Sequence, residues 1–123
     1  MKALLIGEYE VKVVESKKGE SNLDFMYRNI ECDCIDIPRR KIGGKTFEIV
    51  CDDEGLLKIN PRVSAIGKNK EVMLVGNLLV FSGVTPGGDL IDITSEDVKI
   101  VKKNLGMTLD ETGFHPIVMN MEY

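Results

Sequence analysis

The most apolar part of the sequence is Val72–Phe81, and Gly76-Asn77 interrupts it in the middle. Gly and Asn are poor helix-interior residues, so two short strands around a bend fit this stretch better than one helix. Similar short apolar runs occur at Leu4–Ile6, Val11–Val14 and Phe47–Cys51. Apolar residues placed in short runs between turns predict a fold built on a β-sheet.

Two segments carry the signals of a helix start. Ser21-Asn22-Leu23-Asp24 offers a capping side chain followed by an acid in the first turn. The apolar residues that follow it at helical spacing are Leu23, Met26, Tyr27 and Ile30. Thr94-Ser95-Glu96-Asp97 repeats the capping pattern, and Val98, Val101 and Leu105 predict a second amphipathic helix that stops at Gly106.

Turn signals organise the rest of the chain. Gly43-Gly44 is typical of a hairpin turn, and Asp52–Gly55 predicts a tight turn. We expect Leu56–Ile59 to extend the sheet until Asn60-Pro61 stops it. Residues 107–123 are predicted to form a last strand or an arm that docks on a partner.

Length and composition indicate one domain. The 123 residues are too few for two independent cores. We therefore predict a single α+β domain over residues 1–123, with an antiparallel-dominated sheet and two short helices. The formal charge of −4 disfavours general nucleic-acid binding. An odd number of cysteines, and an N-terminus that reads as a strand rather than a signal peptide, predict a cytoplasmic protein with no membrane partner.

No catalytic or metal-binding arrangement stands out. Cys32, Cys34, Cys51 and His115 are ligand types for zinc, but their spacing differs from the paired ligands of common structural zinc motifs. We expect the cysteines to be ordinary small apolar side chains and His115 to be a solvent-exposed histidine of the tail. The acids lie in turns and at helix starts, where local structure explains them. The sequence thus favours binding over catalysis, with no metal and no cofactor.

Two positions are candidates for ligand contacts on residue type alone. Asn60-Pro61-Arg62 is a stiffened turn that could aim an amide and a guanidinium at one point, and Arg suits phosphate recognition. Phe81 ends the most apolar strand, where its ring could stack on a base. The alternative is that Phe81 belongs to the core and Arg62 to the plain surface.

The order of features from Ile49 onward resembles a domain family of small phage and prophage proteins, most of which have no assigned function. The resemblance rests on four segments, Ile49–Leu57, Asn60–Arg62, Val75–Phe81 and Ile93–Val98. It extends to phage anti-Thoeris proteins, which are sponges that bind the cyclic ADP-ribose signal of bacterial TIR immune enzymes without cleaving it. Those proteins are homo-oligomers with ligand pockets near subunit interfaces.

The resemblance implies a pocket for adenine, ribose and a diphosphate. Phe81 is the candidate for stacking, Asn60 and Arg62 are candidates for polar contacts, and Arg28 and Lys102 are further cationic candidates. A cationic residue expected late in the chain has no counterpart, because no Arg follows Arg62.

Three hypotheses of function follow. The first is sequestration of a nucleotide immune signal by a homo-oligomer in the bacterial cytoplasm. The second is an acidic phage protein that inhibits a host protein, partly by DNA mimicry. The third, an enzyme that cleaves such a nucleotide through Cys51 or His115, ranks last because no paired catalytic groups are visible.

Overall fold

The computed structural model describes residues 1–123, which form twelve short strands, two α-helices and one 3₁₀ turn. The helices are α1 (Asn22–Ile30) and α2 (Ser95–Lys103), and the 3₁₀ turn η1 is Gly55–Leu57. The strands are β1 (Lys2–Ile6), β2 (Val11–Glu15), β3 (Ile35–Asp36), β4 (Arg39–Ile42), β5 (Lys45–Asp52), β6 (Val63–Gly67), β7 (Val72–Val75), β8 (Leu78–Phe81), β9 (Gly83–Val84), β10 (Leu90–Ile91), β11 (Leu105–Asp110) and β12 (Gly113–Met121).

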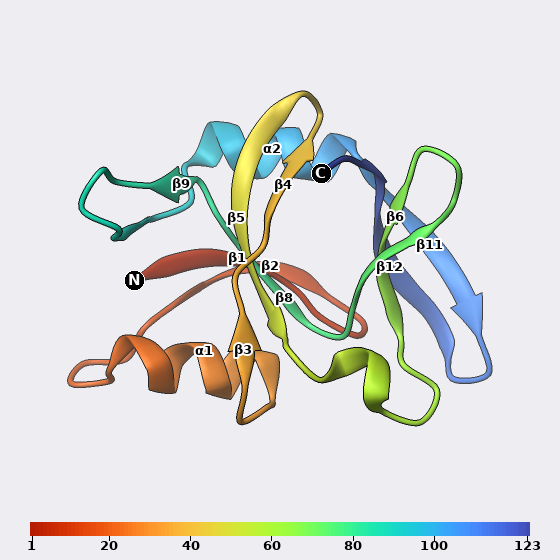
Figure 1. Ribbon diagram of the computed structural model, residues 1–123, viewed down its shortest axis with the longest axis horizontal. Coiled ribbons are helices and arrows are strands. Elements are labelled where there is room, and N and C mark those ends of the chain that lie inside the picture. Colours follow the sequence, from red (N-terminus) through yellow and green to blue (C-terminus); the bar gives the residue numbers. More distant parts are fainter.

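The strands form two main sheets (Figure 1). The first has the order β2-β1-β8-β5-β3, with β4 also paired to β5, and the second has the order β11-β12-β6-β7. The short strands β9 and β10 pair separately. All pairs are antiparallel except β12 with β6, so the predicted α+β class with an antiparallel-dominated sheet is confirmed.

The centre of the first sheet is buried on both faces. All four residues of β8 are buried, and successive side chains point to opposite sides, as they do in any strand. Leu78 and Val80 join one core cluster with residues of α2 and the second sheet, such as Val101 and Val118. Leu79 and Phe81 join another cluster beneath α1. The sheet is therefore the middle layer between α1 on one side and α2 with the second sheet on the other, and its ends carry the connecting loops.

Both predicted helix caps are confirmed. The Ser21 hydroxyl accepts a hydrogen bond from the Asp24 amide at 3.1 Å, and the Thr94 hydroxyl accepts one from the Asp97 amide at 3.2 Å. The predicted hairpin at Gly43-Gly44 is present between β4 and β5. The predicted bend at Gly76-Asn77 separates β7 from β8.

The predicted apolar face of α1 is confirmed at Met26 and Ile30 but wrong at Leu23. Phe25, Met26 and Ile30 are buried, whereas Leu23 is half-exposed, because α1 meets the sheet along the side that carries Phe25. The predicted strand at Leu56–Ile59 is also wrong. The Asp52 carboxylate accepts a hydrogen bond from the Glu54 amide and the chain enters η1, so the apolar side chains of this segment point to solvent.

Residues 107–123 lie within the second sheet as most of the hairpin β11–β12. Helix α2 ends at Lys103, so Leu105 and Gly106 belong to β11 and not, as predicted, to the helix and its stop. Strand β12 inserts between β11 and β6. None of the helices has the length and apolar character required to cross a membrane.

Candidate functional site

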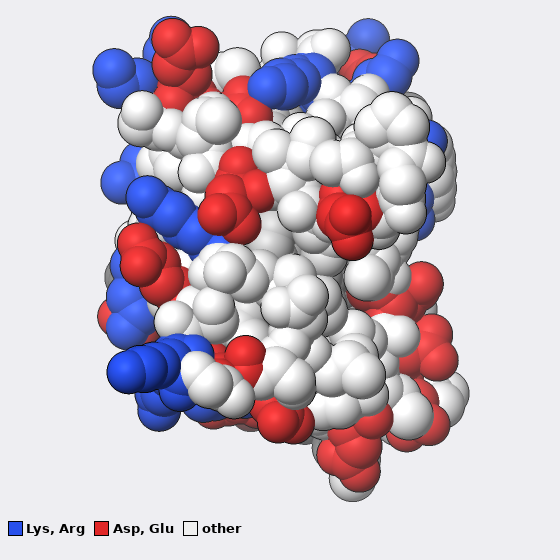
Figure 2. Space-filling view, turned by 90° about the vertical axis from the view of Figure 1, so that its left-hand side faces the viewer, with Lys and Arg blue, Asp and Glu red and all other residues white.

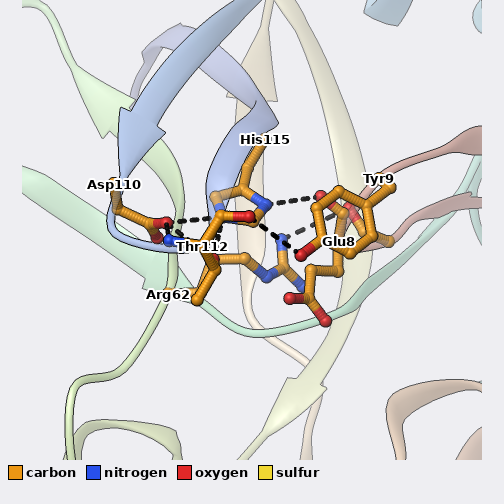
Figure 3. Close-up of polar contacts among 7 residues, drawn as sticks. Glu8, Tyr9, Arg62, Asp110, Thr112 and His115 are labelled. Atoms are coloured by element: carbon orange, nitrogen blue, oxygen red, sulfur yellow. Dashed lines mark hydrogen bonds and ion pairs between the residues drawn. The ribbon is translucent and has the colours of Figure 1, made fainter.

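Four loops meet at one end of the two sheets. They are the β1–β2 turn at residues 7–10, the β7–β8 bend at Gly76-Asn77, the loop Asn60–Arg62 before β6, and the β11–β12 turn. Figure 3 shows side chains that three of these loops, all except the β7–β8 bend, bring together. Turns between strands supply such side chains because their backbone is not committed to a sheet ladder.

Arg62 holds the centre of this cluster. Its guanidinium donates to the Gly7 carbonyl at 3.3 Å and to the Asn77 side-chain oxygen at 2.6 Å. Both acceptors are neutral, and Arg62 forms no ion pair. Burial lowers the pKa of Arg62, while the more distant carboxylates of Glu8 and Asp110 raise it. The half-buried side chain therefore keeps a positive charge without an anion at contact distance.

Asn77 connects Arg62 to helix α1 through hydrogen bonds. Its amide nitrogen donates to the Asn29 carbonyl at 2.9 Å, while its oxygen accepts from Arg62. The φ of +74° at Gly76 belongs to the left-handed region that glycine adopts without strain. Gly76 thus turns Asn77 toward both partners, and the orientation of Arg62 is set before any ligand arrives.

His115 is the second polar centre and is fully buried. Its Nδ1 lies 2.7 Å from the Glu8 carbonyl oxygen, which only accepts, so Nδ1 carries a proton. Its Nε2 lies 2.8 Å from Asp110 Oδ1 and 2.7 Å from the Thr112 hydroxyl. The bond to the Glu8 carbonyl and the nearby Asp110 carboxylate raise the pKa of His115, against an opposing effect of burial.

Asp110 and Tyr9 complete the contact between the two turns. Hydrogen bonds from Thr112 and His115 lower the pKa of Asp110 to about 2. The Tyr9 hydroxyl donates to the Thr112 carbonyl at 3.2 Å, and its ring centre lies 5.1 Å from that of His115 (Figure 3). The β1–β2 turn and the β11–β12 turn are therefore clamped together beside Arg62.

Three adjoining hollows surround this cluster and share Glu8 in their walls. Their volumes are about 180, 480 and 610 Å³, and Arg62 lines the first and the third. The cationic residues in the walls are Arg28, Lys58 and Arg62, and the acidic residues are Glu8, Glu10, Glu31, Asp52, Asp110 and Glu111. The walls are thus acidic around one unpaired guanidinium.

Residues 1–106 match the model of a family described as "Domain of unknown function (DUF3846)". The chain belongs to this family. No curated protein and no solved structure matches the sequence. The DUF3846 region contains Glu8, Arg62 and Asn77, whereas Asp110 and His115 follow it.

The structure brings together three of the five predicted ligand-binding residues of this DUF3846 protein. Asn60 and Arg62 line the 610 Å³ hollow, and Arg28 lines the adjoining 480 Å³ hollow. The charge of Arg28 is already matched by Glu20, whose carboxylate accepts two hydrogen bonds at 2.8 and 2.9 Å. Lys102 lies elsewhere, in a groove that it shares with Lys2 and Lys99.

Phe81 requires a correction. Its side chain is fully buried among Leu79, Phe25 and their neighbours, so its ring has no face open to a ligand. The reason is that β8 lies in the middle of the first sheet and is covered on both sides. The aromatic ring at the hollows is instead Tyr9, which is largely exposed.

His115 also requires a correction, because the predicted solvent-exposed histidine is fully enclosed. Nothing in its sequence neighbourhood shows that the β1–β2 turn, more than 100 residues away, covers it. Asp110 and Thr112 carry a weak local signal, an Asp two residues before a Thr at a turn. The contacts of Glu8 and Tyr9 with this turn have no such signal.

The cysteines do not meet His115. Cys51 is buried in β5, and burial raises the pKa of its thiol to about 12. Cys32 and Cys34 lie together in the loop before β3, where the Cys32 thiol donates to the Cys34 carbonyl. No three His, Cys, Asp or Glu side chains form a group that could hold a metal ion.

Proposed function

We propose that this DUF3846 protein binds and sequesters a nucleotide second messenger, a cyclic ADP-ribose isomer, in the hollows around Arg62. The observation that carries the proposal is the state of Arg62: half-buried, oriented by neutral acceptors and without an anionic partner. A planar guanidinium held in this way is suited to a phosphate oxygen pair. Because its orientation is fixed in advance, little ordering entropy is lost on binding.

The acidic walls suit the rest of such a ligand. Carboxylates accept hydrogen bonds from ribose hydroxyls, and Glu8 and Glu111 stand in the walls of the 610 Å³ hollow. The Asn60 amide in the same wall offers both a donor and an acceptor. The exposed ring of Tyr9 in the adjoining hollow takes the stacking role first given to Phe81. The ligand class therefore combines one anionic group with several hydroxyls and a planar base.

The way His115 is held supports binding without cleavage. Both of its ring nitrogens are engaged by protein atoms, and the side chain is fully buried. A general acid or base must reach the proton it transfers. In this proposal His115 stabilises the walls of the site rather than acting on the ligand.

The biological setting of the proposal comes from the resemblance to phage anti-Thoeris sponges. In this proposal the protein acts in the cytoplasm of a bacterial host cell during phage or prophage expression. There it removes the signal of TIR immune enzymes from its effector. A protein made in excess needs affinity rather than turnover for this role.

The test is recovery of the signal after binding. The purified protein is incubated with a TIR-generated cyclic ADP-ribose isomer and filtered, and the retained fraction is heat-denatured and assayed. We expect depletion from the filtrate and recovery of the intact signal on heating. Arg62→Gln is expected to weaken binding at least tenfold, because a charge-assisted bond contributes about 1.5–3 kcal/mol.

Lys102→Gln is the matched control, since it also removes one cation but lies in a separate groove. Equal loss in both variants would contradict the assignment of the site to Arg62. Signal that stays unchanged in the filtrate of the wild-type protein would exclude this ligand. Signal that disappears without recovery would mean that the protein is an enzyme.

A specific observation also favours the second hypothesis, inhibition of a host protein by an acidic surface. The pairing of β3 with β5 places the acids of residues 31–36 beside those of residues 52–54. The six acids in these two segments are Glu31, Asp33, Asp36, Asp52, Asp53 and Glu54. Figure 2 shows acidic side chains gathered along the lower right of one face, with Lys and Arg along the left. This hypothesis becomes the leading one if the nucleotide is not retained.

A further inference from the structure

Strand β11 is an edge strand with a free outer side. It ends the second sheet, whose order is β11-β12-β6-β7, and it lies at the outer margin of the molecule in Figure 1. An edge strand presents unpaired N–H and C=O groups to any strand that can approach it. The residues of β11 that face outward decide which partner strand can pair with it.

The backbone of β11 shows which residues face outward. The Met119 amide of β12 donates to the Asn104 carbonyl at 2.8 Å, so Asn104 points toward β12. Backbone groups alternate along an antiparallel strand, and the N–H and C=O groups of Leu105, Met107 and Leu109 therefore point away from β12. These three residues form the free edge.

The side chains on β11 do not protect this edge. Met107 and Leu109 are 62% and 65% exposed, and Phe114, which lies opposite Leu109 on β12, is 62% exposed. Natural sheets protect an exposed edge with an inward charge, a Pro or a bulge. Strand β11 contains no Lys, Arg or Pro. An apolar, unprotected edge is typical of a strand that is paired in the working state of the protein.

We propose that β11 pairs antiparallel with β11 of a second copy of this chain, about a two-fold axis at Met107. In this register Leu105 of each copy lies opposite Leu109 of the other. All three outward residues then exchange hydrogen bonds, because residues that face outward on one copy meet residues that face outward on the second. The Met107, Leu109 and Phe114 side chains continue across the axis as one apolar surface.

Charges at the two ends of β11 favour a second copy in this orientation. Lys103 precedes the strand and Glu111 follows it, and both are exposed. Lys103 is the last residue of α2, two residues before β11, so the antiparallel register puts Lys103 of one copy and Glu111 of the other at the same end of the pair, and this occurs at both ends. A parallel arrangement would place Lys103 beside Lys103 and Glu111 beside Glu111, which is unfavourable.

The pairing also changes the candidate site. Glu111 lines the 610 Å³ hollow with Arg62, so the pairing brings the Lys103 end of the second copy's β11 toward this side of the hollow. The consequence for the ligand rests on the proposed function, whereas the dimer itself does not.

The first test is the mass of the protein in solution by sedimentation equilibrium. We expect twice the chain mass of 13.7 kDa at micromolar concentration. Leu109→Lys is expected to weaken dimerisation at least tenfold, because it places a charge in the apolar surface on each copy. Leu57→Lys is the matched control, since Leu57 is also exposed but lies in η1. A monomer at all concentrations, or equal effects of the two variants, would overturn the proposal.

The second test fixes the register by exchanging charges. Lys103→Glu and Glu111→Lys are each expected to weaken dimerisation roughly two- to tenfold, since exposed ion pairs contribute little and occur twice in the dimer. The double variant is expected to restore the wild-type dissociation constant. Both side chains are exposed, so the fold is expected to tolerate the changes. Failure of the double variant to recover would overturn the antiparallel register. Nucleotide retention, measured separately, decides the proposed function independently of these results.

Discussion

Phe81→Ala is expected to lower the free energy of unfolding by about 3–5 kcal/mol, the usual cost of removing a buried aromatic ring from a core. Phe81 is fully buried beside Phe25 and Leu79, between the first sheet and α1. The surrounding strands cannot collapse into the space because they are held by the sheet ladder. Domains of this size have a total stability of about 5–15 kcal/mol, so the variant loses a large part of it. Urea denaturation with linear extrapolation measures the change.

Phe114→Ala is the matched control, because it removes the same ring from an exposed position on β12. We expect a cost below about 1 kcal/mol when both variants carry Leu109→Lys, which keeps the protein monomeric in the proposed arrangement. If Phe81→Ala cost no more than Phe114→Ala and instead abolished nucleotide retention, Phe81 would be a ligand platform after all. The pair of variants thus separates a core residue from a stacking residue.

The parts of the fold that sequence analysis predicted correctly depend on neighbours in the chain. Ser21 and Thr94 cap helices because their hydroxyls reach amides three residues ahead. Gly43-Gly44 makes a hairpin because both glycines adopt the positive φ that this turn needs, +60° and +83°. These interactions are local, so a sequence pattern carries them.

The parts that were missed depend on packing between distant segments. The predicted face of α1 is wrong at its start, because Phe25, rather than Leu23, meets the sheet. The parallel pairing of β12 with β6 joins segments about 50 residues apart and leaves no pattern in either strand. Parallel neighbours require long connections that sequence periodicity does not record.

In the candidate site, too, sequence analysis found the residues with a local signal and missed those whose contacts are distant in the chain. Arg62 and Asn60 were found because a Pro between them indicates a stiff turn with polar side chains. The sequence predicts Asn77 only as part of a bend and does not show that its side chain orients Arg62. His115 was read as exposed because its enclosing partner, Glu8, lies at the other end of the chain.

His115 and Asp110 are expected to give the protein a stability maximum at mildly acidic pH. The pKa of His115 is raised in the folded state, so its contribution is complete below its ordinary pKa of 6.5 and is lost as pH rises through the folded value. The pKa of Asp110 is lowered from 3.8 to about 2, so its contribution is present above 3.8 and is lost as pH falls toward 2. The pair therefore stabilises the fold most between pH 3.8 and 6.5.

Two variants test this expectation through melting temperatures measured from pH 3 to 9. His115→Ala is expected to lower the melting temperature by roughly 5–10 °C at pH 6, because it leaves the Glu8 carbonyl without its hydrogen-bond donor and opens a cavity. Asp110→Asn keeps the shape but removes the carboxylate at Nε2, which lowers the folded-state pKa of His115. The decline in stability above pH 6.5 is therefore expected to be smaller and to end at lower pH than in the wild type.

Asp89→Asn is the control for Asp110→Asn, since Asp89 is an exposed acid in the β9–β10 loop and far in sequence from His115. It is expected to leave the pH profile unchanged. The charged and polar groups that face the His115 ring are Asp110, Thr112, the Glu8 carbonyl, Tyr9 and, at longer range, Arg62. Arg62 lowers the pKa of His115, so Arg62→Gln is expected to extend the stable range to higher pH. A wild-type profile that is flat from pH 5 to 9 would show that folding does not shift the pKa of His115, which would contradict this expectation.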